Sequence, residues 1–461
     1  MSNPVPSLDP HALLVFLLQA ALLLLVALAL GRLATRFGLP ALVGELLTGV
    51  ILGPSLLGAL APGALSFVLP ADADQLHLLD AVGQFGVLLL VGLTGAQLDV
   101  AMLRRRGATG VRVSLGGLLI PLALGIGAGF VVPAALLTDS SEREVFALFL
   151  GVAMCVTAIP VIAKTLADMG LLHRDIGQLT LGAGMVDDAV GWFLLSVVSA
   201  AATTGVHAGT VTLSVVYLLG FVAAALLVGR PLVRWALRLA GRAGDGGPRV
   251  TVSVVIILLG AAATHAMKME ALFGAFVAGI LIGLVRAEDE RRRAAPGDAA
   301  VDLHVEPETP RAGRGVWQDL LPLRTVVLSV LAPLFMATAG LRMDLTALAD
   351  PKVLVAAVAL LAIAIVGKFT GAYLGARLSR LTHWEGIALG AGMNARGIVE
   401  VVVATTGLRL GVLSIATYTV VVLIAVVTSV MGPPILRRAM ARVEQTQAEA
   451  ERELALAGRS S

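Results

Sequence analysis

The stretch GAGMVDDAVGW, residues 182–192, places two aspartates, Asp187 and Asp188, side by side inside a long apolar run. Burying an ionised carboxylate in hydrocarbon is costly. Adjacent residues on a helix point about 100° apart, so one aspartate can face a fixed partner while the other faces a cavity. The pair therefore predicts a buried site that binds a cation or a proton.

A third ionisable group, Lys368, lies in the middle of another apolar run, AIAIVGKFTGAYLG. A buried lysine needs a carboxylate partner or loses its proton. Pairing Lys368 with Asp187 would neutralise both charges and leave Asp188 free to bind an ion. A static ion pair is the alternative, but three buried ionisable groups exceed what one such pair uses.

Two apolar segments carry helix breakers at matching places. The run CVTAIP, residues 155–160, ends in Pro160, which has no backbone donor. The run MNARG, residues 393–397, ends in Gly397, which loosens a helix. Paired interrupted helices in two halves of a chain point to a transporter site near the middle of the membrane, although such residues also serve packing alone in spanning helices.

Polar side chains accompany both breaks. Thr157 and Asn394 offer neutral oxygens, which suit a weakly held monovalent cation. Arg396 and Glu400 are four residues apart and would pair on one helix face, while Arg396 would also complement carbonyl groups freed at a break. For this pair, a structural role and a direct role in transport both stay open.

The composition indicates an integral membrane protein. Of the 461 residues, 57% are hydrophobic and only 14% are charged, against about 25% charged in soluble domains, and the mean hydropathy is +0.91. The net charge of +3 implies no nucleic-acid partner. The single cysteine, Cys155, excludes an intrachain disulfide and any metal site with two thiolate ligands.

Thirteen apolar segments have roughly the length that spans a bilayer. With the amino terminus outside, 27 of the 34 lysines and arginines lie in the inner connections and the carboxyl-terminal tail, five lie in the outer connections and two lie within spans. This imbalance follows the positive-inside rule, so we predict a multi-pass protein of the cell membrane with a cytoplasmic carboxyl terminus. The segments are about 11–30, 41–57, 77–97, 108–132, 144–168, 176–203, 209–230, 250–267, 271–286, 323–342, 352–377, 384–407 and 414–436.

Thirteen spans divide into six, one and six, and an offset of seven reverses the orientation. The fold class predicted is therefore all-α, with two inverted six-helix repeats. The mixed charge and the prolines of residues 287–322 predict a flexible cytoplasmic loop, with a regulatory segment as the alternative. Residues 441–461 predict a short cytoplasmic tail.

Several motifs together, including GELLTGVILGP, VDDAVGW and MNARGIVEVVVATTGLRLGVLS, resemble the monovalent cation:proton antiporters of the second large antiporter family. The resemblance runs over residues 10–440 and is close to the plant cation/proton exchanger branch. It implies a homodimer in which a moving core works against a panel, with the two broken helices crossing in the core. The core would lie within 108–203 and 352–436, the panel within 11–97 and 250–342, and a linker helix at 209–230.

The resemblance also implies roles for three residues. The family's ion-binding aspartate corresponds to Asp188, its salt-bridged aspartate to Asp187 and its partner lysine to Lys368. The expected function is exchange of K⁺ or Na⁺ for H⁺ without a cofactor, with Asp188 holding the cation.

Three other classes of protein are the alternatives. A cation channel or uniporter and a sodium-coupled solute symporter could use the same fold. An intramembrane aspartyl protease would need its two aspartates on different helices.

Overall fold

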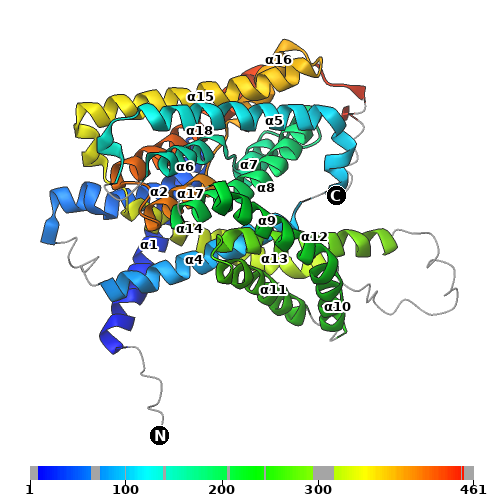
Figure 1. Cartoon of the computed structure of the whole chain (residues 1–461), viewed down its shortest axis with the longest axis horizontal. Coiled ribbons are helices and arrows are strands. Elements are labelled where there is room, and N and C mark those ends of the chain that lie inside the picture. The colour runs from blue at the N-terminus through cyan, green and yellow to red at the C-terminus, as the bar shows by residue number, and fades with distance from the viewer. Residues whose placement is uncertain are drawn as a thin grey trace, which may run out of the picture. The chain divides into compact units, whose positions relative to one another are not determined.

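The computed structural model describes residues 9–63, 73–98, 100–138, 142–204, 208–242, 246–293, 316–447 and 449–450. These residues form helices, and the one strand-like pairing among them is an isolated bridge between Leu137 and Leu413. The helices, labelled as in Figure 1, are α1 (Pro10–Arg36), α2 (Ala41–Leu52), η1 (Pro54–Gly58), α4 (Ala73–Ala96), α5 (Val100–Val131), η2 (Ala134–Leu136), α6 (Arg143–Cys155), α7 (Ile159–Asp168), α8 (Asp175–Thr204), α9 (Ala208–Ala224), η3 (Ala225–Gly229), α10 (Arg230–Gly241), α11 (Gly247–Ala266), α12 (Ala271–Arg293), α13 (Val316–Val326), η4 (Val327–Leu331), α14 (Ala332–Leu341), η5 (Leu345–Ala349), α15 (Pro351–Leu378), α16 (His383–Met393), α17 (Ile398–Arg409) and α18 (Ile415–Met440).

The described chain is that of a multi-pass membrane protein. Eleven of its helices are long and apolar enough to cross a membrane, or twelve if the bent pair α16 and α17 counts as one span. The predicted count of thirteen is therefore not fully reproduced. The difference is the predicted segment 144–168, which is divided between α6 and α7, and each half is too short to cross alone.

The predicted polar loop 287–322 is helical at both ends, because α12 continues to Arg293 and α13 begins at Val316. Residues 294–315 lie outside the described residues, as do residues 451–461 of the predicted tail. The flexibility of the loop stays a prediction.

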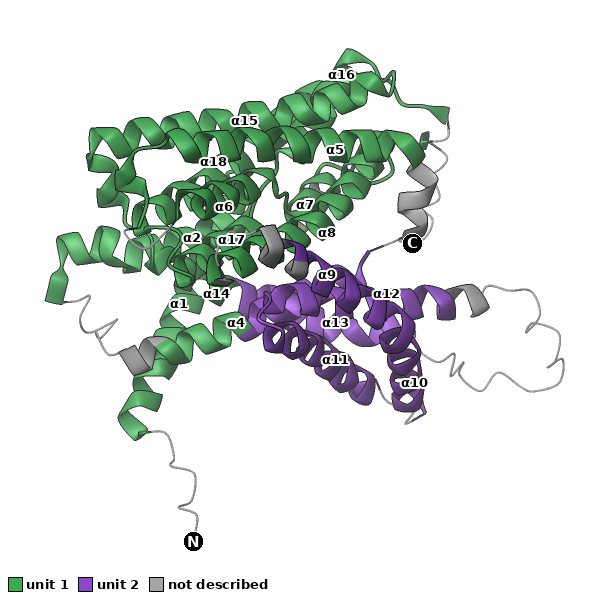
Figure 2. Cartoon of the chain, in the orientation of Figure 1, with its two compact units in different colours: residues 1–84, 100–206, 333–461 green, residues 85–99, 207–332 purple. Residues whose placement is uncertain are grey.

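The chain divides into two compact units (Figure 2). The first comprises residues 1–84, 100–206 and 333–461, and the second comprises residues 85–99 and 207–332. The first unit contains every predicted site residue. The division into a core and a panel, the inverted repeat and the homodimer stay predictions.

Within the first unit, α5 and α15 lie side by side along much of their length (Figure 1). Glycines allow this close approach. A Cβ atom added at Gly116 or Gly371 would collide with the backbone of the other helix, as would one at Gly375 with Arg112. Since association of helices in lipid depends on close packing of small residues, these glycines fix α15 and hence the position of Lys368.

The described end of the chain folds back onto the start of α8. Glu449 accepts a hydrogen bond from the backbone N–H of Asp175 at 2.6 Å and one from that of Thr446 at 2.8 Å, and it lies 3.2 Å from Arg174. Arg174 in turn donates to the backbone carbonyl of Val443 at 2.9 Å. These contacts join the carboxyl-terminal segment to the helix that carries the two aspartates.

We expect Gly371→Ala to destabilise the protein by about 1–3 kcal/mol, because the added methyl group overpacks the contact with α5. Thermal unfolding of the detergent-purified protein measures the effect as a lower Tm. Gly127→Ala is the matched control, since a Cβ atom at this position in α5 meets no atom within 4 Å. Equal Tm values for the two variants would contradict the packing role.

Burial alone would raise the pKa of Glu449, but the N–H groups of Asp175 and Thr446 and the charge of Arg174 lower it below the ordinary value of 4.5. A carboxylate whose pKa is lowered on folding stabilises the folded contact above its unfolded pKa, and this contribution is lost as the pH falls through the folded pKa. The contact should therefore persist to below pH 4.5.

We expect Glu449→Gln to speed hydrogen exchange in residues 443–447 by roughly ten-fold at neutral pH, since it removes a charged acceptor of two backbone hydrogen bonds. Mass spectrometry of the exchanged peptides measures this rate. Glu444→Gln, at an exposed side chain next to the contact, should leave exchange unchanged.

Candidate functional site

The first helix break separates α6 from α7. The helix ends at Cys155, and Val156 and Ala158 have extended backbone angles before α7 begins at Ile159. The predicted breaker, Pro160, lies in the first turn of α7, where the missing N–H of a proline costs little. The break therefore leaves the last carbonyl groups of α6 without helical partners.

The second break separates α16 from α17, which are bent by 45° relative to each other. Asn394 follows the last residue of α16, and Gly397 precedes the first residue of α17. The backbone φ of Gly397 is extended and would allow any residue, so the reason for a glycine here is lack of space. A Cβ atom at this position would lie 2.7 Å from the side chain of Val161 on α7.

The two breaks meet. The backbone N–H of Ala158 in the first break donates to the carbonyl of Ala395 in the second at 3.3 Å. Two segments that are 237 residues apart thus share a hydrogen bond in place of the helical bonds that each has lost.

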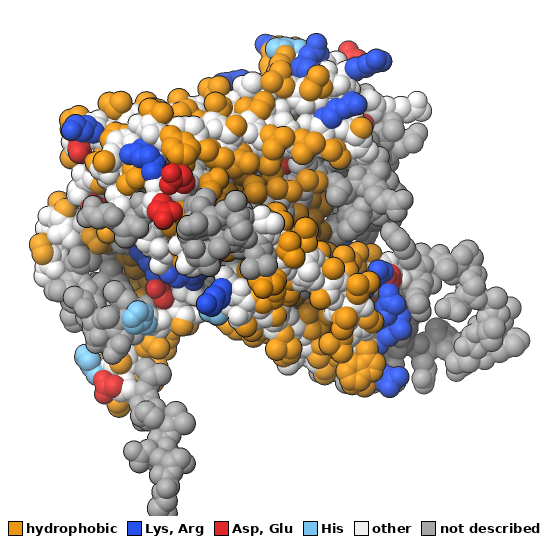
Figure 3. Space-filling view, viewed as in Figure 1, with side chains coloured by type: hydrophobic (Ala, Val, Ile, Leu, Met, Phe, Trp, Pro, Cys, Tyr) orange, Lys and Arg blue, Asp and Glu red, His pale blue; other side chains and the backbone are white. Residues whose placement is uncertain are grey.

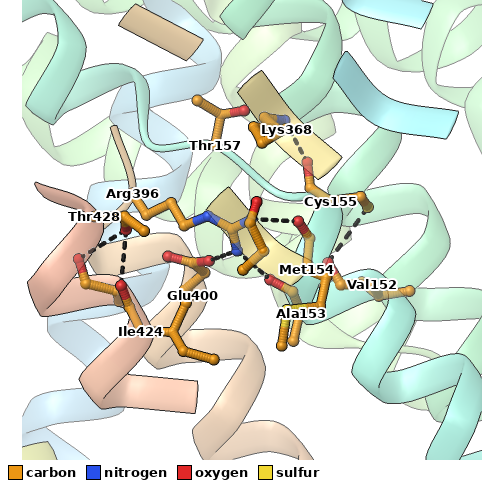
Figure 4. A network of polar contacts seen from close by, with 12 residues as sticks. Val152, Ala153, Met154, Cys155, Thr157, Lys368, Arg396, Glu400, Ile424 and Thr428 are labelled. Carbon is orange, nitrogen blue, oxygen red and sulfur yellow. Dashed lines mark hydrogen bonds and ion pairs between the residues drawn. The ribbon is translucent and has the colours of Figure 1, made fainter. Parts of the chain in front are cut away.

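Two cationic side chains cap the carboxyl-terminal end of α6 (Figure 4). Lys368 donates to the carbonyl of Cys155 at 2.5 Å. Arg396 donates to the carbonyls of Ala153 at 3.1 Å and Met154 at 2.5 Å. The last carbonyls of a helix carry a partial negative charge, and positive groups are favourable there.

Arg396 is completely buried and has further partners. It forms an ion pair with Glu400 and donates to the carbonyl of Ala364 on α15 at 3.3 Å. The hydroxyl of Ser429 on α18 donates to its backbone carbonyl. Arg396 therefore connects α17 with α6, α15 and α18.

Asp187 on α8 is completely buried and accepts from three donors. Ser114 on α5 donates to Oδ1 at 2.7 Å, while Thr157 at the first break and Lys368 on α15 donate to Oδ2 at 2.8 Å and 2.5 Å. The lysine neutralises the carboxylate charge, and the hydroxyls hold both oxygens. Asp187 has the surroundings of a fixed structural anion.

Asp188 has the opposite surroundings although it is the next residue. It is also completely buried, but neither of its carboxylate oxygens has a hydrogen-bond partner among the described residues. Both polar atoms of the Asn394 side chain, which is 1% exposed, are likewise without a partner there. Buried polar groups are nearly always hydrogen-bonded, so these two side chains are exceptions among the residues that the structure describes.

The predicted site residues thus fall into three sets. Lys368 and Thr157 each contact Asp187, and Arg396 contacts Glu400. Asp188 and Asn394 contact neither set through a hydrogen bond.

Two contributors were not anticipated from the sequence, Ser114 and Ser429. Each is one hydroxyl in an apolar run, and nothing in such a run indicates which neighbouring helix it will contact. Among the residues that the structure describes, no three histidine, cysteine, aspartate or glutamate side chains gather where they could hold a metal ion.

Comparison with known proteins identifies the family. Residues 21–442 match the family described as "Sodium/hydrogen exchanger, transmembrane". The chain is 29% identical over 432 residues to the Na(+)/H(+) antiporter NhaS4 of Synechocystis, covering 93% of this chain and 98% of that protein. It is 30% identical over 456 residues to Cation/H(+) antiporter 18 of Arabidopsis thaliana, covering 97% of this chain but 51% of the plant protein. This chain therefore spans about half the length of that plant relative.

The fold is also that of a solved antiporter. The sodium proton antiporter MjNhaP1 of Methanocaldococcus jannaschii superposes with a TM-score of 0.64 over 96% of this chain and 99% of that chain, at 13% sequence identity. The match over 21–442 covers most of the sequence and includes both helix breaks and both aspartates. The chain accordingly belongs to the transmembrane sodium/hydrogen exchanger family, a family of cation/proton antiporters.

Proposed function

We propose that this protein exchanges a monovalent cation, K⁺ or Na⁺, for protons across the cell membrane, and that Asp188 is the carboxylate that both ions share. The observation that carries the proposal is the contrast between the two adjacent aspartates. Asp187 has three donors, whereas Asp188 has none among the described residues.

Charge explains why binding at Asp188 would be exclusive. Lys368 is already paired with Asp187, so an ionised Asp188 would leave one uncompensated negative charge in a completely buried position. Such a charge is strongly disfavoured. Either a proton or a monovalent cation removes it, and once one has bound the other gains nothing. Two ions that compete for one carboxylate are exchanged when the site faces the two sides of the membrane in turn.

Neutral oxygens near the breaks would complete the cation site. Asn394 has a side-chain carbonyl oxygen without a partner among the described residues, and the hydroxyl of Thr157 retains lone pairs after donating to Asp187. Ligands of this type suit a partly dehydrated monovalent cation. Arg396, Glu400, Pro160 and Gly397 would support the site by holding the two breaks in contact.

The names of two relatives bear on which cation is exchanged. The Synechocystis relative is named a Na(+)/H(+) antiporter, and the Arabidopsis thaliana relative is named a Cation/H(+) antiporter. The paired aspartates favour Na⁺, and the resemblance to the plant branch favours K⁺.

We propose alternating access in a homodimer, in which a core containing both breaks moves relative to a panel.

We expect Asp188→Asn to abolish exchange while the protein remains folded, because the amide cannot alternate between a proton and a cation. The measurement is dye-reported proton flux in proteoliposomes with Na⁺, K⁺, Li⁺ or Rb⁺ as the driving ion. Asp80→Asn, at a partly exposed aspartate paired with Arg342, is the control and should retain exchange. Full exchange by a folded Asp188→Asn protein would refute the assignment, and cation flux without proton movement would indicate a channel.

We expect Lys368→Ala to destabilise the protein by about 3–5 kcal/mol, because it strands the buried Asp187 carboxylate. The double variant Asp187→Asn/Lys368→Ala should recover part of this loss, since it removes the stranded charge. Thermal unfolding of the two single variants and the double variant measures the coupling. Additive losses would show that the pair does not stabilise the protein.

A further inference from the structure

The second compact unit contains a helix with three distinct sides. Helices α9, η3 and α10 follow one another without interruption, and the candidate span Val215–Gly241 is almost entirely unburied. In α10 only one side, formed by Val233, Leu237 and Ala240, is buried. The remaining surface of α10 therefore faces the surroundings of this unit.

The second side is a row of arginines at four-residue spacing: Arg230, Arg234, Arg238 and Arg242. Residues four apart on a helix lie about 40° from each other around its axis, so the row winds slowly from the buried side toward the exposed side. Arg230 and Arg234 form ion pairs with Glu288 of α12. Arg238 and Arg242 are exposed, and their side chains make no ion pair or hydrogen bond with the described residues.

The third side is apolar and exposed. Leu232, Trp235 and Leu239 are 60%, 63% and 48% exposed. In Figure 3 basic side chains gather beside hydrophobic ones over this end of the second unit. A tryptophan between a basic row and an exposed leucine face is typical of the membrane–water interface.

The local charge is positive. Arg249 pairs with Asp319 at 2.7 Å and packs against Gly241, next to Arg242. The arginine row and Arg249 thus bring five positive charges, and Glu288 and Asp319 bring two negative charges. The excess is concentrated at Arg238 and Arg242, whose side chains make no ion pair or hydrogen bond with the residues that the structure describes.

We propose that Arg238 and Arg242 bind the phosphodiester headgroup of an anionic phospholipid, with one acyl chain along Leu232, Trp235 and Leu239. Guanidinium groups bind phosphate oxygens through paired hydrogen bonds. One turn of helix separates the two arginines, so a single phosphate can lie between their side chains. The apolar side distinguishes a lipid from free phosphate, which has no acyl chain to bury there.

The test measures how strongly brominated lipids quench Trp235. The full-length protein is reconstituted in phosphatidylcholine vesicles that contain a small fraction of brominated phosphatidylglycerol or brominated phosphatidylcholine. The difference between this protein and Trp235→Phe isolates Trp235 from the other three tryptophans. We expect brominated phosphatidylglycerol to quench Trp235 at a lower mole fraction than brominated phosphatidylcholine does.

We expect each arginine to contribute a preference of about five-fold for brominated phosphatidylglycerol over brominated phosphatidylcholine, and both together roughly 25-fold. The double variant Arg238→Gln/Arg242→Gln should remove this preference. Arg32→Gln/Arg36→Gln, at two exposed arginines with the same spacing on α1, is the matched control and should keep the preference. An equal loss in this control would overturn the proposal, because the effect would then be general surface charge.

Two further outcomes would also overturn it. If millimolar inorganic phosphate abolished the preference without a change in the phosphatidylcholine curve, the arginines would bind free phosphate. If neither brominated lipid quenched Trp235, another protein surface, such as a second copy of this chain, would cover α10.

Discussion

Backbone groups freed at a helix break must find partners, because the surrounding hydrocarbon offers none. In this protein the constraint is met by two cationic side chains at the end of α6, Lys368 and Arg396. A cation in a membrane needs a compensating anion, and each of the two has one, in Asp187 and Glu400. The break, the cations and the anions therefore stabilise one another, and removing any of them leaves another without a partner.

The same contacts make a rigid frame from segments far apart in the sequence. Lys368 connects α15 with α6 and α8, and Arg396 connects α17 with α6, α15 and α18 through its side chain and its backbone carbonyl. Asp187 adds α5 through the hydroxyl of Ser114. Because the frame fixes α8 at Asp187, the direction of the next side chain is fixed as well. Asp188 is held in place without receiving a side-chain hydrogen bond from the part of the chain that the structure describes.

The sequence indicated which charged residues and helix breaks form this site better than it indicated which helices lie next to one another. Buried charges such as Asp187 and Lys368 are recognisable because they contradict their apolar surroundings, and the two breaks are recognisable from Pro160 and Gly397. The donor Ser114 and the close contact of Gly116 with Gly371 depend on which helices are neighbours, and the periodicity of an apolar run does not contain that information. The count of spans differed for a related reason, since a broken span such as α6 with α7 has the composition of one helix but the geometry of two.

An unpartnered carboxylate is a defect if only folding is considered. Supplying Asp188 with a hydroxyl or an amine would cost the chain little, as the three donors around Asp187 show. Such a donor would also stabilise the ionised, empty state and so weaken the competition between a proton and a cation on which the proposed exchange depends. In the proposed exchange, the absence of a donor among the described residues would be the feature that couples the two ions, and the saturated Asp187 beside it would be the condition under which the fold tolerates that absence.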